Sequence, residues 1–357
     1  MAKLGEVCKL NMGQSPDSSS YNDTGDGIPF FQGNADFGEV HPNIRVWCNA
    51  PTKIAHPGEI LISVRAPIGA MNIADCECCI GRGLASISAD EAVCTTKYLW
   101  YGISSKIEEL NAKGTGSTFK AVNKKTLEET EIPIRDLMEQ ERIAAKLDSV
   151  TALITLRKRQ VKKLDELVKA RFVEMFGDPV NNPMNYPKSQ LGKVCDVRDG
   201  THDSPEYYDV GYPLVTSKNV TGGKIDLSEC NLISEDDYKK ICERSKVDRG
   251  DIIMPLIGTV GKPVIVNTEP LFAIKNVALI KFTPDSLVTN IYIKTLLESD
   301  YFDRAVLDKI RGGTQKFIAL GDIRRLEIIL PDLKHQQCFS AFVERVDQQK
   351  QTVQQSL

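Results

Sequence analysis

The sequence lacks the features of a membrane protein or an exported one. No apolar stretch approaches the ~18 residues that cross a bilayer, and the stretch around Tyr98–Ile103 is far too short. The residues after Met1 lack the apolar core of a signal peptide, so we expect a cytoplasmic protein with no membrane partner. A formal net charge of −3 excludes a uniformly basic nucleic-acid binder, but it leaves room for a local basic surface.

Patterns for catalysis are equally scarce. The segment from Gly258 to Pro263 is similar to a phosphate-binding Walker loop, but its gap is too short and proline stands where the metal-binding hydroxyl belongs. No glycine-rich dinucleotide-binding motif follows a strand pattern. His202, Asp203 and Ser204 are the residue types of a hydrolytic triad, yet adjacency in the sequence is not triad geometry. We therefore expect no catalytic residue and no cofactor in this chain.

Potential metal ligands are few and badly spaced. The 4 histidines form no ligand pair, and Cys76, Cys78 and Cys79 lack a second cysteine or histidine pair at zinc-site spacing. Ordinary thiols are therefore favoured over zinc at these positions, and we expect no metal site. The 10 cysteines are scattered through the chain, which favours free thiols over a disulfide framework.

What the chain does have is enough length for two folded domains. Its 357 residues exceed the roughly 100–200 residues of one ordinary domain. A hydrophobic content of 41% and a charged content of 26% are typical of folded soluble proteins.

The two domains follow one plan, because four blocks of the first half recur in the same order in the second. The first block is LGEVCKLNMGQSP from Leu4, which matches LGKVCDVRDGTHDSP from Leu191, and the second is HPGEILISVRAPIGA from His56, which matches DRGDIIMPLIGTVGK from Asp248. The third block is GTGSTFKAVNKKTLEETEIPI from Gly114, which matches GGTQKFIALGDIRRLEIILPD from Gly312. The fourth is the proline, Pro133 or Pro331, that precedes a glutamine-bearing helical stretch in each copy. Such an ordered repeat indicates an internal duplication whose intervening segments have diverged.

Within each copy the apolar pattern predicts mostly strands with a few short helices. Turn dipeptides at Gly58 and Gly250 precede β-prone runs. We predict strands at 60–64, 252–254, 264–266 and 277–280, and helical pieces at 96–110 and 288–309. The fold class is therefore α/β mixed (α+β), with a pseudo-two-fold internal repeat.

Two long helices link or follow the copies. Apolar residues at alternating steps of four and three form a heptad seam, which includes Ile143, Leu147, Val150, Ile154, Val161, Leu164 and Val168 in the first helix and Phe339, Val343, Val346 and Val353 in the second. The first helix is predicted from about Gln140 to Phe176, or ~55 Å. Either each helix packs on its own domain, or the two pack antiparallel and hold the domains apart; we favour the second arrangement. The predicted division is 1–136, 137–177, 178–332 with a proline-rich lead-in at 178–187, and 333–357.

Basic residues concentrate on the first long helix. Two acidic residues, Asp165 and Glu166, accompany seven basic ones, namely Arg157, Lys158, Arg159, Lys162, Lys163, Lys169 and Arg171. This strip is either a solvated flank of the coiled coil or a surface for nucleic-acid phosphates.

Polar side chains suited to base edges lie in the predicted loops of both copies. The candidates are Gln14, Ser15, Asn34, Arg65 and Lys120 in the first copy, and Thr201, His202, Lys218, Asn219, Lys262 and Lys316 in the second.

The whole chain resembles the specificity (S) subunits of type I DNA restriction-modification systems. The resemblance lies in the blocks GQSPDSSSYN, GEILISVRAPIG, IGRGLASIS, GSTFKAVNKKTLEETEIPI, LDELVKARFVEMFGDP, DGTHDSP and GDIIMPLIGTVGK, in family order. It implies two target recognition domains separated by two long antiparallel coiled-coil helices. The two recognition domains together would read a two-part, asymmetric duplex DNA target.

The resemblance also implies partners. Two methyltransferase (modification) subunits would dock on the helices and carry S-adenosylmethionine, and an ATP- and Mg-dependent endonuclease (restriction) subunit would join the complex. The chain itself would be non-catalytic. Two alternatives stay open: a coiled-coil protein-interaction scaffold that does not read DNA, and a stand-alone nuclease or methyltransferase of unfamiliar type.

Overall fold

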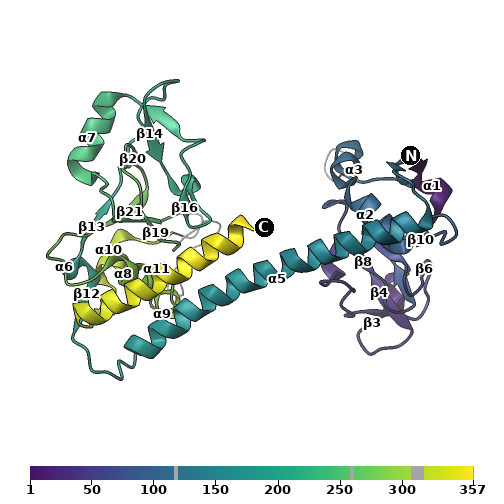
Figure 1. Ribbon diagram of the computed structural model, residues 1–357, viewed down its shortest axis with the longest axis horizontal. Helices are drawn as coiled ribbons and strands as arrows, with labels where there is room; N and C mark the ends of the chain where they lie inside the picture. The colour runs from purple at the N-terminus through teal and green to yellow at the C-terminus, as the bar shows by residue number, and fades with distance from the viewer. Residues whose placement is uncertain (116–119, 258–260, 307–316, 357) are drawn as a thin grey trace. The chain divides into compact units, whose positions relative to one another are not determined.

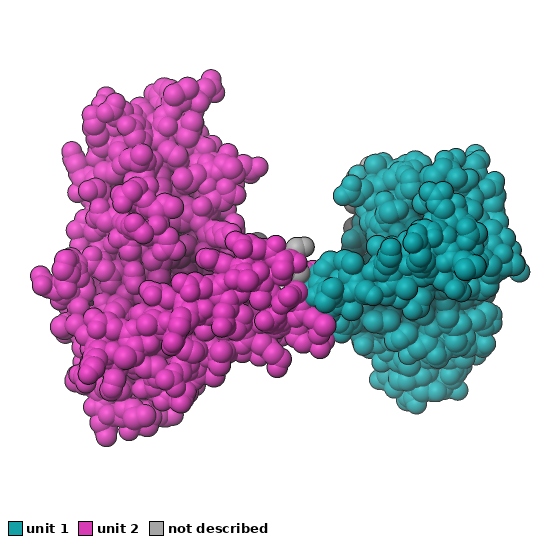
Figure 2. All heavy atoms as spheres, in the orientation of Figure 1, with its two compact units in different colours: residues 1–155 teal, residues 156–357 magenta. Residues whose placement is uncertain are grey.

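The computed structural model describes residues 1–115, 120–257, 261–306 and 317–356 (Figure 1). The chain forms two compact units, residues 1–155 and 156–357, coloured separately in Figure 2. The boundary falls within one continuous helix, α5 (Leu137–Phe176), so each unit owns part of it. No helix among the described residues is long and apolar enough to cross a membrane.

Unit 1 is built on a four-stranded antiparallel sheet in the order β2-β10-β7-β8. Its strands are β2 (Cys8–Met12), β7 (Ile60–Ser63), β8 (Met71–Ile73) and β10 (Leu84–Ala89). Helix α2 (Thr96–Ser104) buries Leu99 and Ile103 in the same core as the sheet residues Ile60 and Ile62. Thr95 begins this helix by accepting a hydrogen bond from the Tyr98 backbone N–H.

The remaining elements of unit 1 frame this sheet. A second sheet has the order β3-β5-β4-β9-β6, and β1 pairs with β11. Their bounds are β1 (Ala2–Lys3), α1 (Leu4–Val7), β3 (Tyr21–Asn22), β4 (Ile28–Phe31), β5 (Trp47–Cys48), β6 (Ile54–Ala55), β9 (Cys78–Ile80), α3 (Ile107–Lys113), α4 (Lys124–Glu128) and β11 (Glu131–Ile132).

Unit 2 repeats the central plan of unit 1. Its four-stranded sheet has the order β13-β21-β18-β19, with strands β13 (Asp196–Asp199), β18 (Ile252–Pro255), β19 (Val264–Ile265) and β21 (Val277–Lys281). The shared elements also include β12 (Lys188–Gln190), α6 (Leu191–Val194), α8 (Asn290–Leu297), α10 (Leu320–Arg325) and β22 (Glu327–Ile329). The predicted mixed fold and its internal duplication are therefore confirmed.

The remaining elements of unit 2 lie outside its central sheet. They include β14 (Tyr212–Val215), β15 (Val220–Thr221), β16 (Lys224–Ile225), β17 (Asn231–Ile233), α7 (Glu235–Ser245) and β20 (Ala273–Ile274). Of these, β17, β14 and β20 form a three-stranded sheet of their own. The sequence did not suggest α7, because most of its residues are polar and its apolar stripe is short. The pieces predicted at 96–110 and 288–309 each divide into two helices, α2 with α3 and α8 with α9 (Asp300–Ala305); residues 307–309 lie outside the described residues.

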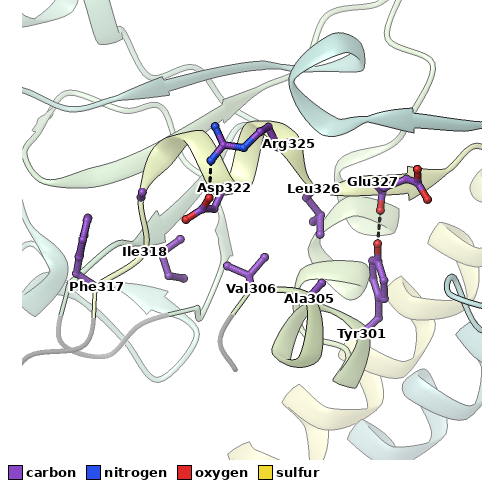
Figure 3. Close-up of a pocket in the computed structure, with 10 residues that line it drawn as sticks. Tyr301, Ala305, Val306, Phe317, Ile318, Asp322, Arg325, Leu326 and Glu327 are labelled. Carbon is purple, nitrogen blue, oxygen red and sulfur yellow. Dashed lines mark hydrogen bonds and ion pairs between the residues drawn. The ribbon is translucent and has the colours of Figure 1, made fainter. Parts of the chain in front are cut away.

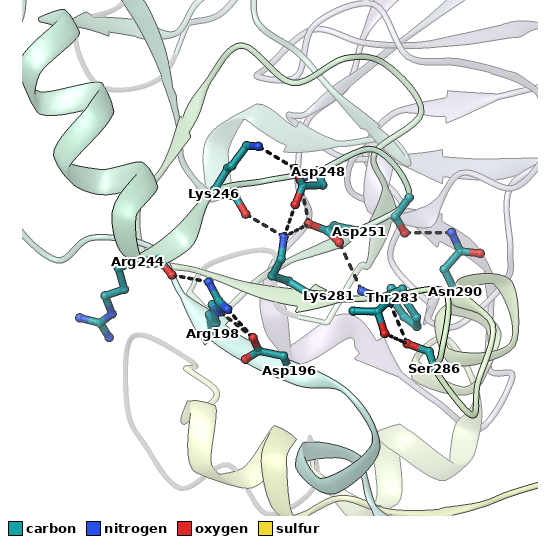
Figure 4. Close-up of polar contacts among 12 residues, drawn as sticks. Asp196, Arg198, Arg244, Lys246, Asp248, Asp251, Lys281, Thr283, Ser286 and Asn290 are labelled. Atoms are coloured by element: carbon teal, nitrogen blue, oxygen red, sulfur yellow. Dashed lines mark hydrogen bonds and ion pairs between the residues drawn. The ribbon is translucent and has the colours of Figure 1, made fainter.

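A partly buried lysine connects strands and turns of the central sheet of unit 2 (Figure 4). Lys281 on β21 donates to Asp251 at 2.7 Å, to Asp248 at 2.8 Å and to the Lys246 carbonyl at 2.9 Å. Burial alone would lower the pKa of Lys281, but the bonds to the two carboxylates outweigh it and raise the pKa. The first copy has Ser88 paired with Lys9 at the equivalent place in its sheet, so the copies share a backbone plan and not a polar interior.

In unit 2, the end of α5 packs antiparallel on α11 (Leu333–Gln355). Phe339 lies against both Phe172 and Phe176, with ring centroids 5.6 and 5.5 Å apart, while Lys350 pairs with Asp165 at 2.7 Å further along. From the first contact to the second, the residue number decreases along α5 and increases along α11, so the two helices run antiparallel. The predicted antiparallel packing is therefore present between these parts of the two helices.

The seam residues fall into two groups. In unit 2 they are half-buried or buried, namely Val161, Leu164, Val168, Phe339, Val343, Val346 and Val353. In unit 1, Ile143 packs against the core, but Leu147 and Val150 stay 36% and 51% exposed. Within unit 1, α5 therefore presents apolar side chains that the described residues of that unit leave uncovered.

We expect the aromatic cluster at the end of α5 to dominate the stability of unit 2. Phe176 is 0% exposed and contacts Tyr292 and Phe339. Phe176→Ala should lower the free energy of unfolding of unit 2 by about 3–5 kcal/mol through lost burial and the cavity left behind. Val173→Ala on the same helix, 56% exposed, is the matched control and should cost less than ~0.5 kcal/mol. Urea denaturation measures both; equal effects would contradict this account.

Candidate nucleic-acid interface

Three loops meet at one end of the central sheet of unit 1, and we call this meeting point the first junction. The loop after β2 donates from Gly13 N to Leu84 O at 2.9 Å and from Gln14 N to Ile80 O at 3.0 Å. The loop after β4 is joined by a 2.8 Å bond from Gly81 N to Phe31 O. These bonds bring Gln14 and Ser15 close to the turn 81–83 that connects β9 with β10.

Two further candidates reach the first junction through the end of β7. Val64 N donates to Gly83 O at 2.9 Å, and Ala66 N donates to Lys120 O at 3.1 Å. Arg65 and Lys120 are thereby neighbours, and both side chains are exposed. The loop after β4 begins a short 3-10 helix at Asn34. All five candidates of the first copy therefore lie on connected loops of one surface.

Arg82 belongs to this surface, and sequence reasoning missed it. It is exposed, and its backbone N–H donates to the Ser15 hydroxyl at 3.3 Å. Glycine on its C-terminal side is required by close packing, since a Cβ at Gly83 would lie 2.3 Å from the Gln32 carbonyl oxygen. The signal available in the sequence was the Gly-Arg-Gly turn directly before a strand.

Unit 2 builds the same meeting of loops, the second junction, with the same backbone bonds. Gly200 N donates to Val277 O at 3.0 Å, Thr201 N donates to Ile274 O at 2.9 Å, and Lys275 N donates to Val215 O at 2.9 Å. Thr201, His202 and the turn 275–276 are thus brought together, with Lys218 exposed on the neighbouring loop. The duplication extends to the loops that carry the candidate residues.

The side chains of the two junctions differ although their backbones correspond. Where the first has the turn Gly81-Arg82-Gly83, the second has Lys275-Asn276. Lys275 Nζ donates to the Ser204 hydroxyl at 2.6 Å, and Asn276 takes a left-handed backbone conformation with φ 55°. No pattern along the chain singles out these two residues, because only the fold places them beside Thr201 and His202.

His202 is held by two acceptors on the second junction. Its ring nitrogens lie 2.9 Å from Asn276 Oδ1 and 2.9 Å from Asp199 Oδ2. The bonds to Asn276 and then to Asp199 raise the pKa of His202, although partial burial and Arg244 oppose the rise. Burial alone would raise the pKa of Asp199. The hydrogen bond from His202 and the ion pair between Asp199 and Arg244 outweigh burial and lower this pKa.

The remaining candidates of the second copy are placed less uniformly. Asn219 is only 8% exposed, and its Oδ1 accepts from the Thr216 backbone N–H at 3.0 Å and from the Thr216 hydroxyl at 2.9 Å. It therefore caps a 3-10 helix, and its side-chain oxygen is already occupied. Lys262 is exposed, and Lys316 lies outside the described residues.

The basic strip of α5 is solvent-exposed within unit 2. Five of its members, Lys158, Arg159, Lys162, Lys163 and Lys169, are exposed and make no ion pair with the residues that the structure describes. Arg157 donates to Gln160 at 3.0 Å, while Arg171 pairs with Glu174 at 2.8 Å and lies over the Phe342 ring. Cations without internal partners are available to phosphates or to an acidic protein surface.

Among the hollows of unit 2, two have polar side chains in their linings. The larger, of about 560 Å³, lies between α9 and α10, where Asp322 pairs with Arg325 and Tyr301 donates to the Glu327 carbonyl at 2.5 Å (Figure 3). Its polar side chains therefore already bond within the unit. The smaller, of about 240 Å³, adjoins the second junction and is lined by Thr201, Ser204, Lys240 and Arg244 among others.

The cysteines are free thiols, and six of the ten are buried. Cys78 and Cys79 are consecutive on β9 and belong to two different core clusters, because neighbouring strand residues point to opposite faces. Burial raises the pKa of Cys78 to about 12, which keeps it a thiol. In the described ranges, no group of three or more histidine, cysteine or acidic side chains is arranged to hold a metal ion.

The family model for the type I restriction modification DNA specificity domain matches residues 1–166 and 183–357. The chain belongs to this family. Each of the two matched regions of this specificity-domain family contains one junction.

Individual relatives agree with the family assignment. The chain is 42% identical over 161 residues to the MjaX specificity subunit of Methanocaldococcus jannaschii, covering 45% of this chain and 38% of that protein. It is 19% identical over 385 residues to the EcoBI specificity subunit of Escherichia coli, covering 97% and 78%. The alignments thus span well under two thirds of the MjaX protein and 63% of the MjaVIII specificity subunit.

A solved structure shares the fold of this specificity-domain protein. The S subunit of a type I restriction-modification system from M. genitalium aligns with a TM-score of 0.54 and 15% identity, covering 99% of this chain and 90% of that one. This similarity supports the arrangement of elements within the fold.

We expect His202 to make the stability of unit 2 dependent on pH. Because its pKa is raised on folding, the stabilisation is fully present below pH ~6.5 and is lost as pH rises through the higher folded-state pKa. Asp199→Asn should move the His202 pKa back towards ~6.5, since it removes the charge of one acceptor. NMR titration of the His202 ring measures its pKa in the wild-type chain and in the Asp199→Asn variant. An unchanged value in Asp199→Asn would contradict the assigned cause.

Proposed function

We propose that this chain is the non-catalytic DNA-reading subunit of a type I restriction-modification complex. It recognises an asymmetric duplex target in two parts, one part read by each junction. It positions methyltransferase and endonuclease subunits on that target, and those partners supply the chemistry with S-adenosylmethionine, ATP and Mg.

The observation that carries this proposal is the pair of junctions. Each is the same meeting of loops at the same end of the same sheet, which supports the same task performed twice. Their side chains differ. The exposed Arg65, Arg82 and Lys120 lie on one junction, while the exposed His202 and the partly buried Thr201 and Lys275 lie on the other. Guanidinium, ammonium and amide groups bond different base edges in the major groove, so two unlike junctions favour two unlike half-sequences.

The long helices supply surfaces for the other partners. Leu147, Val150, Leu153 and Leu156 are each at least 36% exposed on consecutive turns of α5. Exposed apolar side chains in such a row favour a protein partner that covers them. Methyltransferase subunits are the partners that the family membership favours for this surface. A scaffold without DNA reading would use the same helices, and it differs by giving no sequence preference in the experiment below.

The test is to select bound duplexes from a random pool with the full chain and to sequence them. The full chain should enrich two short half-sequences separated by a fixed unread gap. Arg82→Ala should weaken binding about 10- to 100-fold and relax only one half, because one bidentate base contact contributes ~1–3 kcal/mol. Lys275→Ala should relax only the other half.

Lys3→Ala is the matched control for both substitutions. Lys3 is exposed on β1, and strand β2 separates it from the first junction along the chain. This variant should leave both half-sequences unchanged. Enrichment of a single continuous sequence, or of none, would overturn the proposed function.

A second experiment concerns the basic strip. We expect the triple substitution of Lys158, Lys162 and Lys169 by Gln to reduce the slope of log affinity against log salt by up to about 3, since each phosphate contact contributes ~0.9. The selected half-sequences should stay the same, because phosphate contacts carry no base information.

The control for the strip substitutes Lys188, Lys239 and Lys294, three lysines already paired with Glu327, Glu235 and Glu298. Equal slopes for the wild-type chain and the strip variant would show that the strip faces a protein partner instead of DNA.

A further inference from the structure

Each long helix has a completely buried glutamine in its first turns. Gln140 lies in the first turns of α5 and Gln336 in the first turns of α11, and both are 0% exposed. They stand at the same position of the two copies, three residues after the first residue of the helix. A buried amide must have its hydrogen bonds satisfied inside the protein, so these two side chains are informative about what surrounds them.

The two glutamines make the same three hydrogen bonds. Gln140 Oε1 accepts from Thr95 N at 2.9 Å, and Nε2 donates to Val93 O and Arg135 O, both at 2.8 Å.

In the second copy, Gln336 Oε1 accepts from Thr289 N at 2.8 Å, and Nε2 donates to Leu287 O at 3.0 Å and to Pro331 O at 2.8 Å. Each donor and acceptor of one copy has its counterpart at the corresponding place in the other. We call each set of three bonds a glutamine joint.

Each joint connects the start of one helix with the start of another. Thr95 and Thr289 are the capping residues of α2 and α8, whereas Gln140 and Gln336 belong to α5 and α11. In unit 2, α8 lies beside α11 (Figure 1), and the Thr289 hydroxyl is 3.3 Å from the Ser340 hydroxyl one turn further along. In unit 1, Asp148 on α5 accepts from Lys97 at 2.8 Å and from Tyr101 at 2.8 Å, both on α2.

The joints lie on the path between the junctions and the long helices. Helix α2 packs in the same core as β2, β7 and β10, and α8 packs in the same core as β13, β18 and β21. These strands end at the junction loops. Because the core is closely packed, α2 or α8 and the sheet beneath it move together as a rigid body. The joint ties that helix to α5 or α11, so it determines how a junction is oriented relative to its long helix.

We propose that Gln140 and Gln336 are positioning residues that fix the angle between each DNA-reading domain and its long helix, and thereby the gap allowed between the two half-sequences. This inference rests on the proposed function. Changing the gap by one base pair moves a half-site by ~3.4 Å and rotates it by about a tenth of a turn. A protein rejects a duplex with the wrong gap only if its reading domains resist that displacement. Three buried hydrogen bonds resist a change of the angle between two helices more strongly than apolar contacts do, because apolar contacts have no preferred direction.

The test compares gap lengths in duplexes selected from a random pool by the full chain. Gln336→Met keeps the side-chain length and removes the three bonds. It should recover the same two half-sequences, with the gap spread over at least three lengths where the wild-type chain selects one. Gln337→Met is the matched control, because Gln337 is the exposed neighbour on α11, and it should keep the single gap.

A purely structural role makes a different prediction. In that case Gln336→Met lowers the melting temperature and the affinity for every target, while the gap stays single; this result would overturn the proposal. Asp148→Ala covers the possibility that the buried variants fail to fold. Its side chain is 42% exposed, so its loss leaves the core intact while it removes two further bonds that hold α2 against α5 beside the joint of unit 1.

We expect Asp148→Ala to broaden the gap to at least two lengths, and an unbroadened gap in this variant also counts against the proposal. If the wild-type chain selects no two-part target, the proposed function has failed and not the role of the joints.

Discussion

The antiparallel pairing of β2 with β10, and of β13 with β21, is the interaction on which the rest of each unit depends. It brings together segments far apart in the chain, with Cys8 opposite Ala89 and Asp196 opposite Lys281. One face of each sheet is buried against a helix, because a strand alternates its side chains between two faces. The same pairing carries the loops that follow β2 and β13 to the turns that precede β10 and β21, and so creates the junctions.

Duplication of this plan gives the chain two junctions that share their backbone bonds and differ in their side chains. The backbone bonds of the junctions are repeated, so the loops stand in equivalent places. Their side chains are not needed for these bonds, and they are free to differ without loss of the fold. Arg82 and Lys275 show this freedom, since both project from turns whose position is determined by main-chain groups.

The helices show the opposite behaviour, because their buried ends are constrained on all sides. Phe172, Phe176 and Phe339 fill the core of unit 2, while Gln140 and Gln336 bond three main-chain groups each. Between these ends the surface of α5 is charged or apolar and exposed. The chain thus combines hydrogen-bonded attachment at the helix starts with open surface along α5.

The sequence by itself determined the duplication, the central strands at 60–64 and 252–254, and the two long helices with their apolar heptad seam. These features follow from local periodicity and from matching blocks, which a linear reading detects. It also located candidate loop residues, although it included Asn219, whose side-chain oxygen caps a helix turn.

Only the tertiary structure decided that Arg82, Lys275 and Asn276 share a surface with the candidates, and that Gln140 and Gln336 are buried joints. The physical reason is that these roles depend on hydrogen bonds between residues many positions apart, such as Gln140 with Thr95. No periodicity along the chain encodes such bonds, because they exist only once strands and helices have packed.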